Sequence, residues 1–229
     1  VDGIRRRFAL WPASCLLCGA RSDSDLCVAC IADLPANKNR CRRCALPLAI
    51  DASICGDCLR RPPPFTAAFA PFRYGYPLDA LIMRFKFGRD LASGNALAQL
   101  WLDHASAAER PQAIVPVPLH LSRLRERGYD QALELAAPIA LALGLPLADA
   151  LLRRERATSP QTELDARARR RNVRGAFAVT DTPPAHVALF DDVMTTGATL
   201  RECARMLVRA GAQRVDVWAL ARAPARGLT

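Results

Sequence analysis

The sequence contains no apolar run approaching the roughly 18 residues that a membrane-spanning helix requires. Its N-terminal stretch is basic but holds too few apolar residues before Pro12 to serve as a secretory signal. No Gly-Lys-Ser or Gly-Lys-Thr triplet occurs, which excludes a Walker A phosphate loop. Because the sequence has neither a membrane-spanning run nor a secretory signal, we expect a soluble, cytoplasmic protein without membrane insertion. Its 229 residues can form one α/β domain of roughly 150 residues and a smaller module.

Lysine, histidine and aromatic residues are scarce. Lys38 and Lys86 are the lysines among 32 basic residues, and aromatic residues make up 6% of the chain. The formal net charge is nevertheless +10, which favours polyanions such as phosphorylated substrates or nucleic acid. The arginine clusters lack interleaved aromatic side chains, so they are poorly suited to stacking on bases. Of the histidines, only His120 stands in a plausible place, and we expect it to bind a ligand rather than to act as a base.

Cysteine is concentrated at the N-terminal end, in four Cys-x2-Cys pairs. The paired residues are Cys15, Cys18, Cys27, Cys30, Cys41, Cys44, Cys55 and Cys58. Two such pairs can complete a tetrahedral zinc site, so four pairs predict two structural zinc ions. A single zinc ion, disulfides and an iron–sulfur cluster are the alternatives. Sequential pairing closes the shortest loops, but the spacing leaves a cross-braced arrangement open.

The three prolines that follow Arg61 mark a stiff spacer between two parts of the chain. We predict a zinc-ribbon module over residues 1–61 and a second domain over residues 65–229. In that domain the pattern indicates strands over 67–74 and 113–117, and helices over 78–87, 95–104 and 131–143. Cys203 lies on the apolar face of a later helix, so we expect a buried thiol and not a nucleophile.

The most informative run is the thirteen-residue stretch ALFDDVMTTGATL. An apolar strand over 187–190 ends in Asp191 and Asp192, and a Thr/Gly turn then opens a helix that Gly211 stops. A second apolar strand follows over 215–220. The pattern predicts a βαβ unit with its ligand site at the carboxyl end of the first strand. Backbone N–H groups of a glycine turn at a helix N-terminus suit a phosphate, and carboxylates at a strand end suit ribose hydroxyls.

This run is similar to the phosphoribosyl-pyrophosphate (PRPP) binding motif of type I phosphoribosyltransferases. The resemblance implies a mostly parallel sheet flanked by helices, in which the paired acids hold the ribose hydroxyls and the turn wraps the 5′-phosphate. It assigns the catalytic role to Asp191 and Asp192. The PRPP-binding residues that it implies are Asp191, Asp192, Val193, Met194, Thr195, Thr196, Gly197, Ala198 and Thr199.

The cysteine pairs, together with the runs IVPVPLH, RERGYDQA and RATSPQTELDARARRRNVRGAF, resemble the ComF family. Its members combine an N-terminal double zinc ribbon with a phosphoribosyltransferase domain. The resemblance implies a pyrophosphate loop formed by Pro116, Val117, Pro118 and His120. It also implies a flexible loop over the substrate, with ligands from Arg153, Arg156, Gln161, Arg171 and Arg174. The chain departs from the family at Asp130, where the usual residue is asparagine, and the added charge argues against a phosphate contact there.

Two functions fit these observations. The first is a phosphoribosyltransferase that uses PRPP with Mg2+, linked to DNA uptake or to nucleotide and nucleoside metabolism. The second is a non-catalytic competence protein that binds single-stranded DNA and keeps the PRPP pocket as a sensor or scaffold. A zinc-dependent transcription regulator fits poorly, because no recognition-helix pattern is visible in the cysteine-rich segment. The partners expected are therefore PRPP and, under the second reading, single-stranded DNA and the competence machinery.

Overall fold

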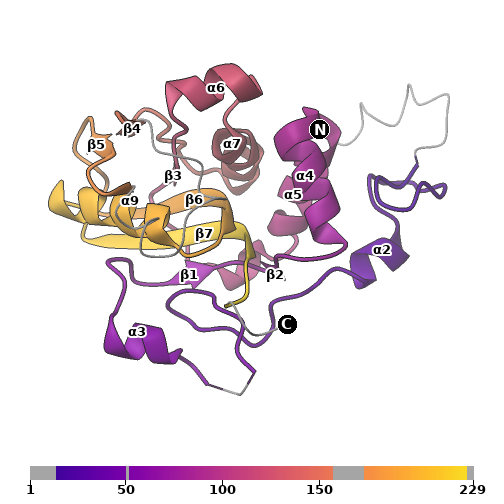
Figure 1. The fold of residues 1–229 in the computed structure, drawn as a ribbon, viewed down its shortest axis with the longest axis horizontal. Coiled ribbons are helices and arrows are strands. Elements are labelled where there is room, and N and C mark those ends of the chain that lie inside the picture. The colour runs from indigo at the N-terminus through magenta and orange to yellow at the C-terminus, as the bar shows by residue number, and fades with distance from the viewer. Residues whose placement is uncertain (1–13, 50–51, 157–172, 226–229) are drawn as a thin grey trace.

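The computed structural model describes residues 14–49, 52–156 and 173–225, which are drawn in colour in Figure 1. Within this part of the chain five strands form a parallel sheet in the order β1-β7-β6-β3, with β2 pairing the later part of β7. The strands are β1 (Ala68–Phe69), β2 (Phe72–Arg73), β3 (Ala113–Pro116), β6 (His186–Met194) and β7 (Arg214–Arg222). The parallel sheet predicted from the sequence is therefore confirmed.

Helices cover both faces of the sheet, and two separate cores result. Along β6, Val187 and Leu189 belong to one core, whereas Ala188 and Phe190 belong to the other, as the alternation of a strand requires. Helix α9 (Ala198–Arg209) packs in the first core, and α4 (Leu78–Gly88), α5 (Leu91–Leu102) and α7 (Gln131–Leu143) pack in the second. We call these the α9 core and the α7 core.

The predicted βαβ unit is present as β6, α9 and β7. The strand β6 is longer than predicted, because it continues through both aspartates to Met194, where Arg222 of β7 is still its partner. Two adjacent residues of one strand point to opposite faces, so Asp191 and Asp192 are directed to different cores. The helix that follows ends near the predicted stop.

Two predictions for the first half of the domain were inaccurate. The strand expected over 67–74 is split into β1 and β2 at Pro71, which has no N–H group for the sheet. Helix α5 begins four residues before the predicted start, because Asp90 caps it and accepts a bond from the Ser93 N–H at 3.2 Å. Gly94 lies inside this helix because a Cβ there would stand 2.6 Å from the ring of Phe85.

Shorter elements complete the architecture. A short helix α6 (Leu121–Arg127) precedes α7, and a 3-10 turn η1 (Ala105–Ala107) follows α5. An antiparallel hairpin of β4 (Leu152–Arg154) and β5 (Phe177–Val179) lies beside α9. Among the described residues, no helix has the length and hydrophobicity to cross a bilayer.

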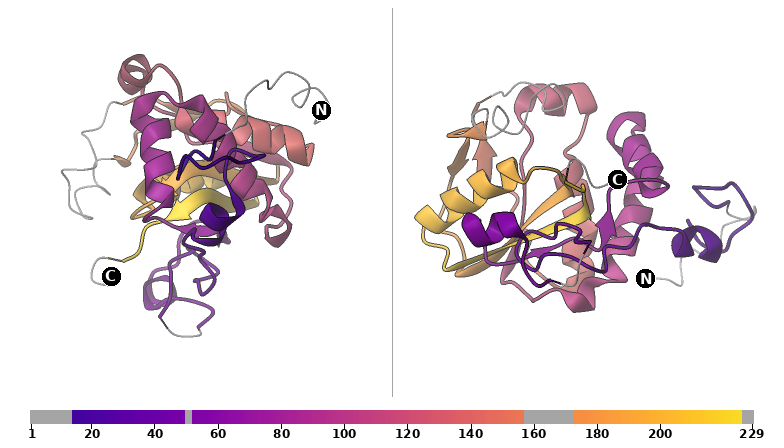
Figure 2. Two further views of the ribbon diagram at one scale, coloured as in Figure 1. Left: turned by 90° about the vertical axis from the view of Figure 1, so that its right-hand side faces the viewer. Right: turned by 60° about the horizontal axis from the view of Figure 1, so that its bottom comes forward.

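The N-terminal segment is not a single compact head. It carries α2 (Val28–Ala32) and α3 (Gly56–Arg60), which lie far apart in Figure 1 and in the right view of Figure 2. Cys15 and Leu26 pack in the α7 core, whereas Cys41 and Cys58 pack in the α9 core. The two halves of the segment therefore sit on opposite sides of the sheet. The boundary between residues 61 and 65 stays a prediction.

Candidate functional site

A cavity of about 500 Å³ opens at the carboxyl ends of β3 and β6. Asp191, Asp192 and Val193 come from β6, and Val117 and Pro118 follow β3. The remaining walls come from α4, α6, the start of α7, β4 and the start of α9. Ligands of parallel α/β folds bind at this edge of the sheet, so the cavity lies where the sequence predicted a site.

The two aspartates have different surroundings. Asp192 is 8% exposed and points to the side of α4, whereas Asp191 is half-buried and points to the side of α9 and β4. Desolvation and the neighbouring charge of Asp192 raise the pKa of Asp191 well above its usual value, although Lys86 acts in the opposite direction. A ligand that brings positive charge or hydroxyl donors to Asp191 would stabilise the charged form of this carboxyl group.

Lys86 of α4 is the partner of Asp192. Its Nζ lies 2.6 Å from Asp192 Oδ2, and the pair faces the cavity. Burial lowers the pKa of Lys86, but the Asp192 carboxylate outweighs this effect and the pKa lies above its usual value. Sequence reasoning missed this residue. The signal was available, because Lys86 is a rare lysine in a chain whose other basic residues are almost all arginine.

Three arginines form a cationic wall of the cavity: Arg123 and Arg127 of α6 and Arg154 of β4. Burial lowers the pKa of Arg123, as does the charge of Arg127, and burial also lowers the pKa of Arg154. The Arg127 guanidinium donates to Gln131 Oε1 at 2.7 Å and lies 5.4 Å from the centre of the exposed Phe87 ring. The cavity thus combines carboxylates, guanidinium groups and the aromatic side chains of Tyr74 and Phe87.

The residues expected for a flexible loop are placed differently. Arg153, Arg156 and Arg174 are exposed and do not line the cavity, and Gln161 and Arg171 lie outside the described residues. In β4 the side chains alternate, so Arg154 faces the cavity while Arg153 faces solvent. Arg154 belongs to the basic stretch between Arg153 and Arg174 and lines the cavity, although the sequence analysis did not select it as a site residue.

The loop after β3 agrees in part with the predicted pyrophosphate loop. Val117 and Pro118 line the cavity, whereas Pro116 is the last residue of β3. His120 does not line the cavity; it caps α6, and its Nδ1 accepts from the Ser122 N–H at 3.2 Å. In the structure His120 therefore stabilises the first turn of α6.

Asp130 braces the same loop. Its carboxylate accepts from the Leu119 N–H at 2.7 Å and from the N–H groups of Ala132 and Leu133 in the first turn of α7. Burial raises the pKa of Asp130, and these N–H groups partly offset the rise. Leu119 uses Oδ2 of this carboxylate, whereas Ala132 and Leu133 use Oδ1, so an asparagine, which has one side-chain acceptor oxygen, could keep only one of these two sets of bonds. The neighbouring Tyr129 hydroxyl donates to the carbonyl of Phe85, next to Lys86.

The turn from Thr195 to Thr199 leads from β6 into α9. Gly197 caps the helix with φ of 70°, and a Cβ there would lie 2.7 Å from Cε of Met194, so this position requires glycine. Thr196 Oγ1 accepts from the Ala198 N–H at 3.3 Å, and Thr195 and Thr199 line the cavity. The turn therefore places the N-terminus of α9 at the edge of the cavity.

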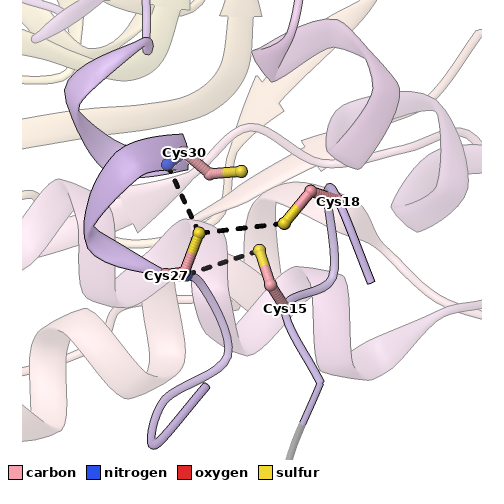
Figure 3. A group of neighbouring side chains, drawn as sticks. All are labelled: Cys15, Cys18, Cys27 and Cys30. Atoms are coloured by element: carbon pink, nitrogen blue, oxygen red, sulfur yellow. Dashed lines mark hydrogen bonds between the residues drawn. The ribbon is translucent and has the colours of Figure 1, made fainter. Parts of the chain in front are cut away.

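The cysteines form two clusters in sequential order. In each cluster the four sulfur atoms lie within 4.8 Å of one another, and Figure 3 shows the first cluster. The first cluster consists of Cys15, Cys18, Cys27 and Cys30, and the second of Cys41, Cys44, Cys55 and Cys58. None of these eight cysteines forms a disulfide, and the sequential grouping excludes the cross-braced pairing.

The surroundings of the sulfur atoms fit zinc. The Cys27 N–H donates to Cys15 Sγ at 3.4 Å, and the Cys55 N–H donates to Cys41 Sγ at 3.3 Å. Burial raises the pKa of the Cys15 thiol, but N–H groups of Cys18, Cys27 and Leu17 outweigh it, and the pKa falls to about 6. Four cysteine sulfur atoms complete a tetrahedral zinc site and leave no open position, so both clusters fit structural zinc sites.

Comparison with known proteins agrees with this geometry. Residues 8–59 match the model of the double zinc ribbon domain. The chain is 37% identical to the DNA utilization protein YhgH of Salmonella typhimurium over 92% of this chain and 97% of that protein. It is 36% identical to competence protein F of Haemophilus influenzae over 80% of this chain and 84% of that protein. The chain belongs to the ComF family.

Membership in the ComF family confirms the resemblance drawn from the cysteine pairs and the aspartate motif. A more distant member, competence protein ComFC of Streptococcus pneumoniae, is 28% identical over 67% of each chain. Among solved structures, orotate phosphoribosyltransferase from Aeropyrum pernix is similar at a TM-score of 0.37, with 23% identity over 59% of this chain and 63% of that chain. The chain thus joins a double zinc ribbon to a parallel sheet that is flanked by helices.

Proposed function

We propose that the cavity binds PRPP, with the 5′-phosphate on the turn from Thr195 to Thr199 and the ribose hydroxyls on Asp191 and Asp192. The observation that carries the proposal is the continuity of these two parts: strand β6 delivers both carboxylates, and the next residues form the glycine turn that caps α9. One rigid βαβ unit therefore offers acceptors for hydroxyl groups beside donors for a phosphate.

The cationic wall suits the pyrophosphate. Arg123, Arg127 and Arg154 line the same cavity as the aspartates, and guanidinium groups bind phosphate oxygens in bidentate fashion. Asp191 and Asp192 offer the oxygen ligands that Mg2+ prefers, and Mg2+ would supply charge neutralisation at the departing pyrophosphate. Lys86 holds Asp192 in place and is close enough to the cavity to share its charge with a bound phosphate.

The reaction that this arrangement supports is phosphoribosyl transfer. A nucleophile forms a bond to ribose C1 while the bond from C1 to the pyrophosphate oxygen breaks, and pyrophosphate leaves with the bonding electrons. The arginines would stabilise the negative charge that develops on the leaving group. Phe87 offers a flat face for a planar acceptor, since its ring is 63% exposed at the cavity wall.

Titration calorimetry with PRPP and Mg2+ tests the binding proposal. A hydrogen bond to a charged group contributes about 1.5–3 kcal/mol, so Asp192→Asn is expected to weaken binding by roughly 10- to 100-fold. Asp149→Asn is the matched control, because Asp149 is an exposed aspartate that does not line the cavity. Equal affinity in wild type and in a variant with both Asp191→Asn and Asp192→Asn would refute the proposal.

A second pair of variants tests the cationic wall. Arg154→Gln is expected to weaken PRPP binding by roughly tenfold, whereas Arg153→Gln, which changes the exposed neighbour, is expected to leave it within about twofold. The opposite order would favour the flexible-loop role that the sequence suggested for Arg153. Release of pyrophosphate from PRPP, measured with the same proteins, separates turnover from binding.

Single-stranded DNA is the second candidate ligand. Four exposed arginines that do not line the cavity add positive charge to the surface of the molecule: Arg125, Arg153, Arg156 and Arg174. Several relatives are named DNA utilization or competence proteins, which agrees with a DNA partner. Log affinity should fall with log salt by about 0.7 per phosphate contacted, and fluorescence anisotropy over a salt series measures this slope. No binding at low salt would leave PRPP as the sole proposed ligand.

A further inference from the structure

Arg222, the last residue of β7, is a buried arginine with 6% exposure. Its Nε donates to the carbonyl of Cys44 at 3.0 Å. Its Nη1 donates to the carbonyl of Met194 at 2.9 Å and also to the carbonyls of Thr195 and Ala223. Every acceptor in these four bonds is a backbone carbonyl, so the guanidinium fixes the path of the chain on two sides.

The two sides belong to different parts of the molecule. Cys44 is a member of the second cysteine cluster, whereas Met194 and Thr195 begin the turn that leads to Gly197 and α9. These segments are about 150 residues apart in the sequence, and Arg222 lies 178 positions after Cys44. A single planar group therefore joins a metal knuckle to the proposed phosphate turn.

The position requires arginine and not simply positive charge. The guanidinium presents N–H groups in several fixed directions in one plane, whereas a lysine ammonium is a compact point charge. A single lysine ammonium group at this position could bond either the Cys44 carbonyl or the turn carbonyls, but not both. A carbonyl left without its donor in this buried setting raises the free energy of the ordered turn.

We propose that Arg222 is a positioning residue that couples metal occupancy of the second cluster to the affinity of the phosphate turn. The inference rests on the proposed function, because it takes PRPP as the ligand of the turn. Metal fixes the Cys41–Cys44 knuckle and with it the Cys44 carbonyl, which orients Arg222, which in turn holds Met194 and Thr195. Coupling free energies are reciprocal, so bound PRPP must also stabilise the metal of the second cluster.

The test uses the full chain loaded with zinc. Zinc is extracted with a chelator in the presence and absence of PRPP and Mg2+, while alkylation of the freed thiols, read by peptide mass spectrometry, assigns release to each cluster. The expected result is that PRPP slows alkylation of Cys41–Cys58 by at least fivefold and leaves Cys15–Cys30 nearly unchanged. PRPP that binds without protecting the second cluster would overturn the coupling while leaving the proposed function standing.

Variants show whether Arg222 carries the effect. Arg222→Lys and Arg222→Met are expected to keep zinc in both clusters, to weaken PRPP binding by roughly tenfold and to abolish the protection. Arg84→Met is the matched control, because Arg84 donates to the Leu16 carbonyl in the first cluster at 2.6 Å and does not reach the turn. Full protection in folded Arg222→Lys would overturn the assignment to this residue.

A ligand-free measurement separates the inference from the proposed function. Amide hydrogen exchange of residues 194–199 in the wild-type chain is compared before and after zinc leaves the second cluster. Exchange should accelerate by at least tenfold, because the turn loses its brace on the cluster side. Unchanged exchange would refute the coupling even if PRPP binds, whereas accelerated exchange without PRPP binding would preserve the coupling and refute the ligand.

Discussion

The two cysteine clusters share one ligand pattern but differ in what surrounds them. In the second cluster all four cysteines are buried, and they pack in the α9 core beside the strands of the sheet. In the first cluster only Cys15 is fully buried and Cys18 is exposed. Spacing alone does not distinguish these clusters, so the same motif can be a peripheral support or a part of the site, depending on its neighbours.

The groups that connect the second cluster to the sheet are also more deeply buried than those that connect the first cluster. The second cluster is joined through buried groups: Arg222 holds the Cys44 carbonyl, and the amide of Asn37 donates to the carbonyls of Ala45 and Ala70. The first cluster is joined through Arg84, whose side chain is 47% exposed and also pairs with Asp90. Buried hydrogen bonds are costly to lose and exposed ones are not, so we expect the second cluster to matter more.

The largest effect is expected from removing two ligands of the second cluster with Cys55→Ser and Cys58→Ser. A structural zinc site contributes roughly 10–16 kcal/mol in small zinc domains, which is comparable to the whole stability of about 5–15 kcal/mol of an ordinary domain. The double variant should lose cooperative thermal unfolding or unfold at least 10 °C below wild type. Circular dichroism with zinc analysis measures this, and a Tm within 2 °C of wild type would contradict the comparison.

The matched change in the first cluster, Cys27→Ser with Cys30→Ser, should have a smaller effect. We expect one zinc ion per chain, a folded sheet and a PRPP affinity within about threefold of wild type, because the phosphate turn does not contact this cluster. Elemental analysis and titration calorimetry check the two parts. If this variant lost PRPP binding while the second-cluster variant kept it, the roles of the clusters would be reversed.

The order of zinc loss should sharpen the difference without any mutation. Exposed thiolates are reached by a chelator more readily than buried ones, so the first cluster is expected to release its metal roughly tenfold faster. A metallochromic dye followed over time should record two phases of equal amplitude. A single phase would mean that the two clusters open together and would remove the basis of the comparison.

The smallest effect is expected for Arg84→Met. Its bonds to Leu16 and Asp90 are largely at the surface, and such contacts contribute about 1 kcal/mol or less. The melting temperature should fall by about 1–4 °C, with both zinc ions retained. A loss larger than that of Arg222→Met would show that the connection of the first cluster is the stronger one.

Local patterns predicted the parts of the fold that depend on neighbours in the sequence. The apolar run before Asp191, the glycine of the turn and the helical spacing up to Val208 were sufficient to predict β6, α9 and β7. The cysteines were predicted to form two four-cysteine sites, and the structure was needed to choose sequential over cross-braced pairing and to exclude disulfides. Element lengths failed where a partner decided them, as at Met194, which β7 holds in the sheet.

The candidate site was predicted less completely, because most of it is non-local. Asp191, Asp192, Thr195 and Thr199 line the cavity as a strand–turn–helix pattern suggests. Lys86 is placed by the packing of α4 and by Tyr129, and no pattern around it indicates a carboxylate partner. Arg222 reads in the sequence as the end of an apolar strand, and its role depends on a cysteine knuckle 178 residues away.

The central claim is that PRPP occupies the cavity at the carboxyl end of β6. A crystal structure of the full chain with PRPP and Mg2+ tests it most directly. The account predicts the 5′-phosphate within hydrogen-bonding distance of the N–H groups of residues 196–199, the ribose hydroxyls on Asp191 and Asp192, and the pyrophosphate against Arg123, Arg127 or Arg154. Ligand bound elsewhere on the molecule, with the turn and the aspartates unliganded, would contradict it.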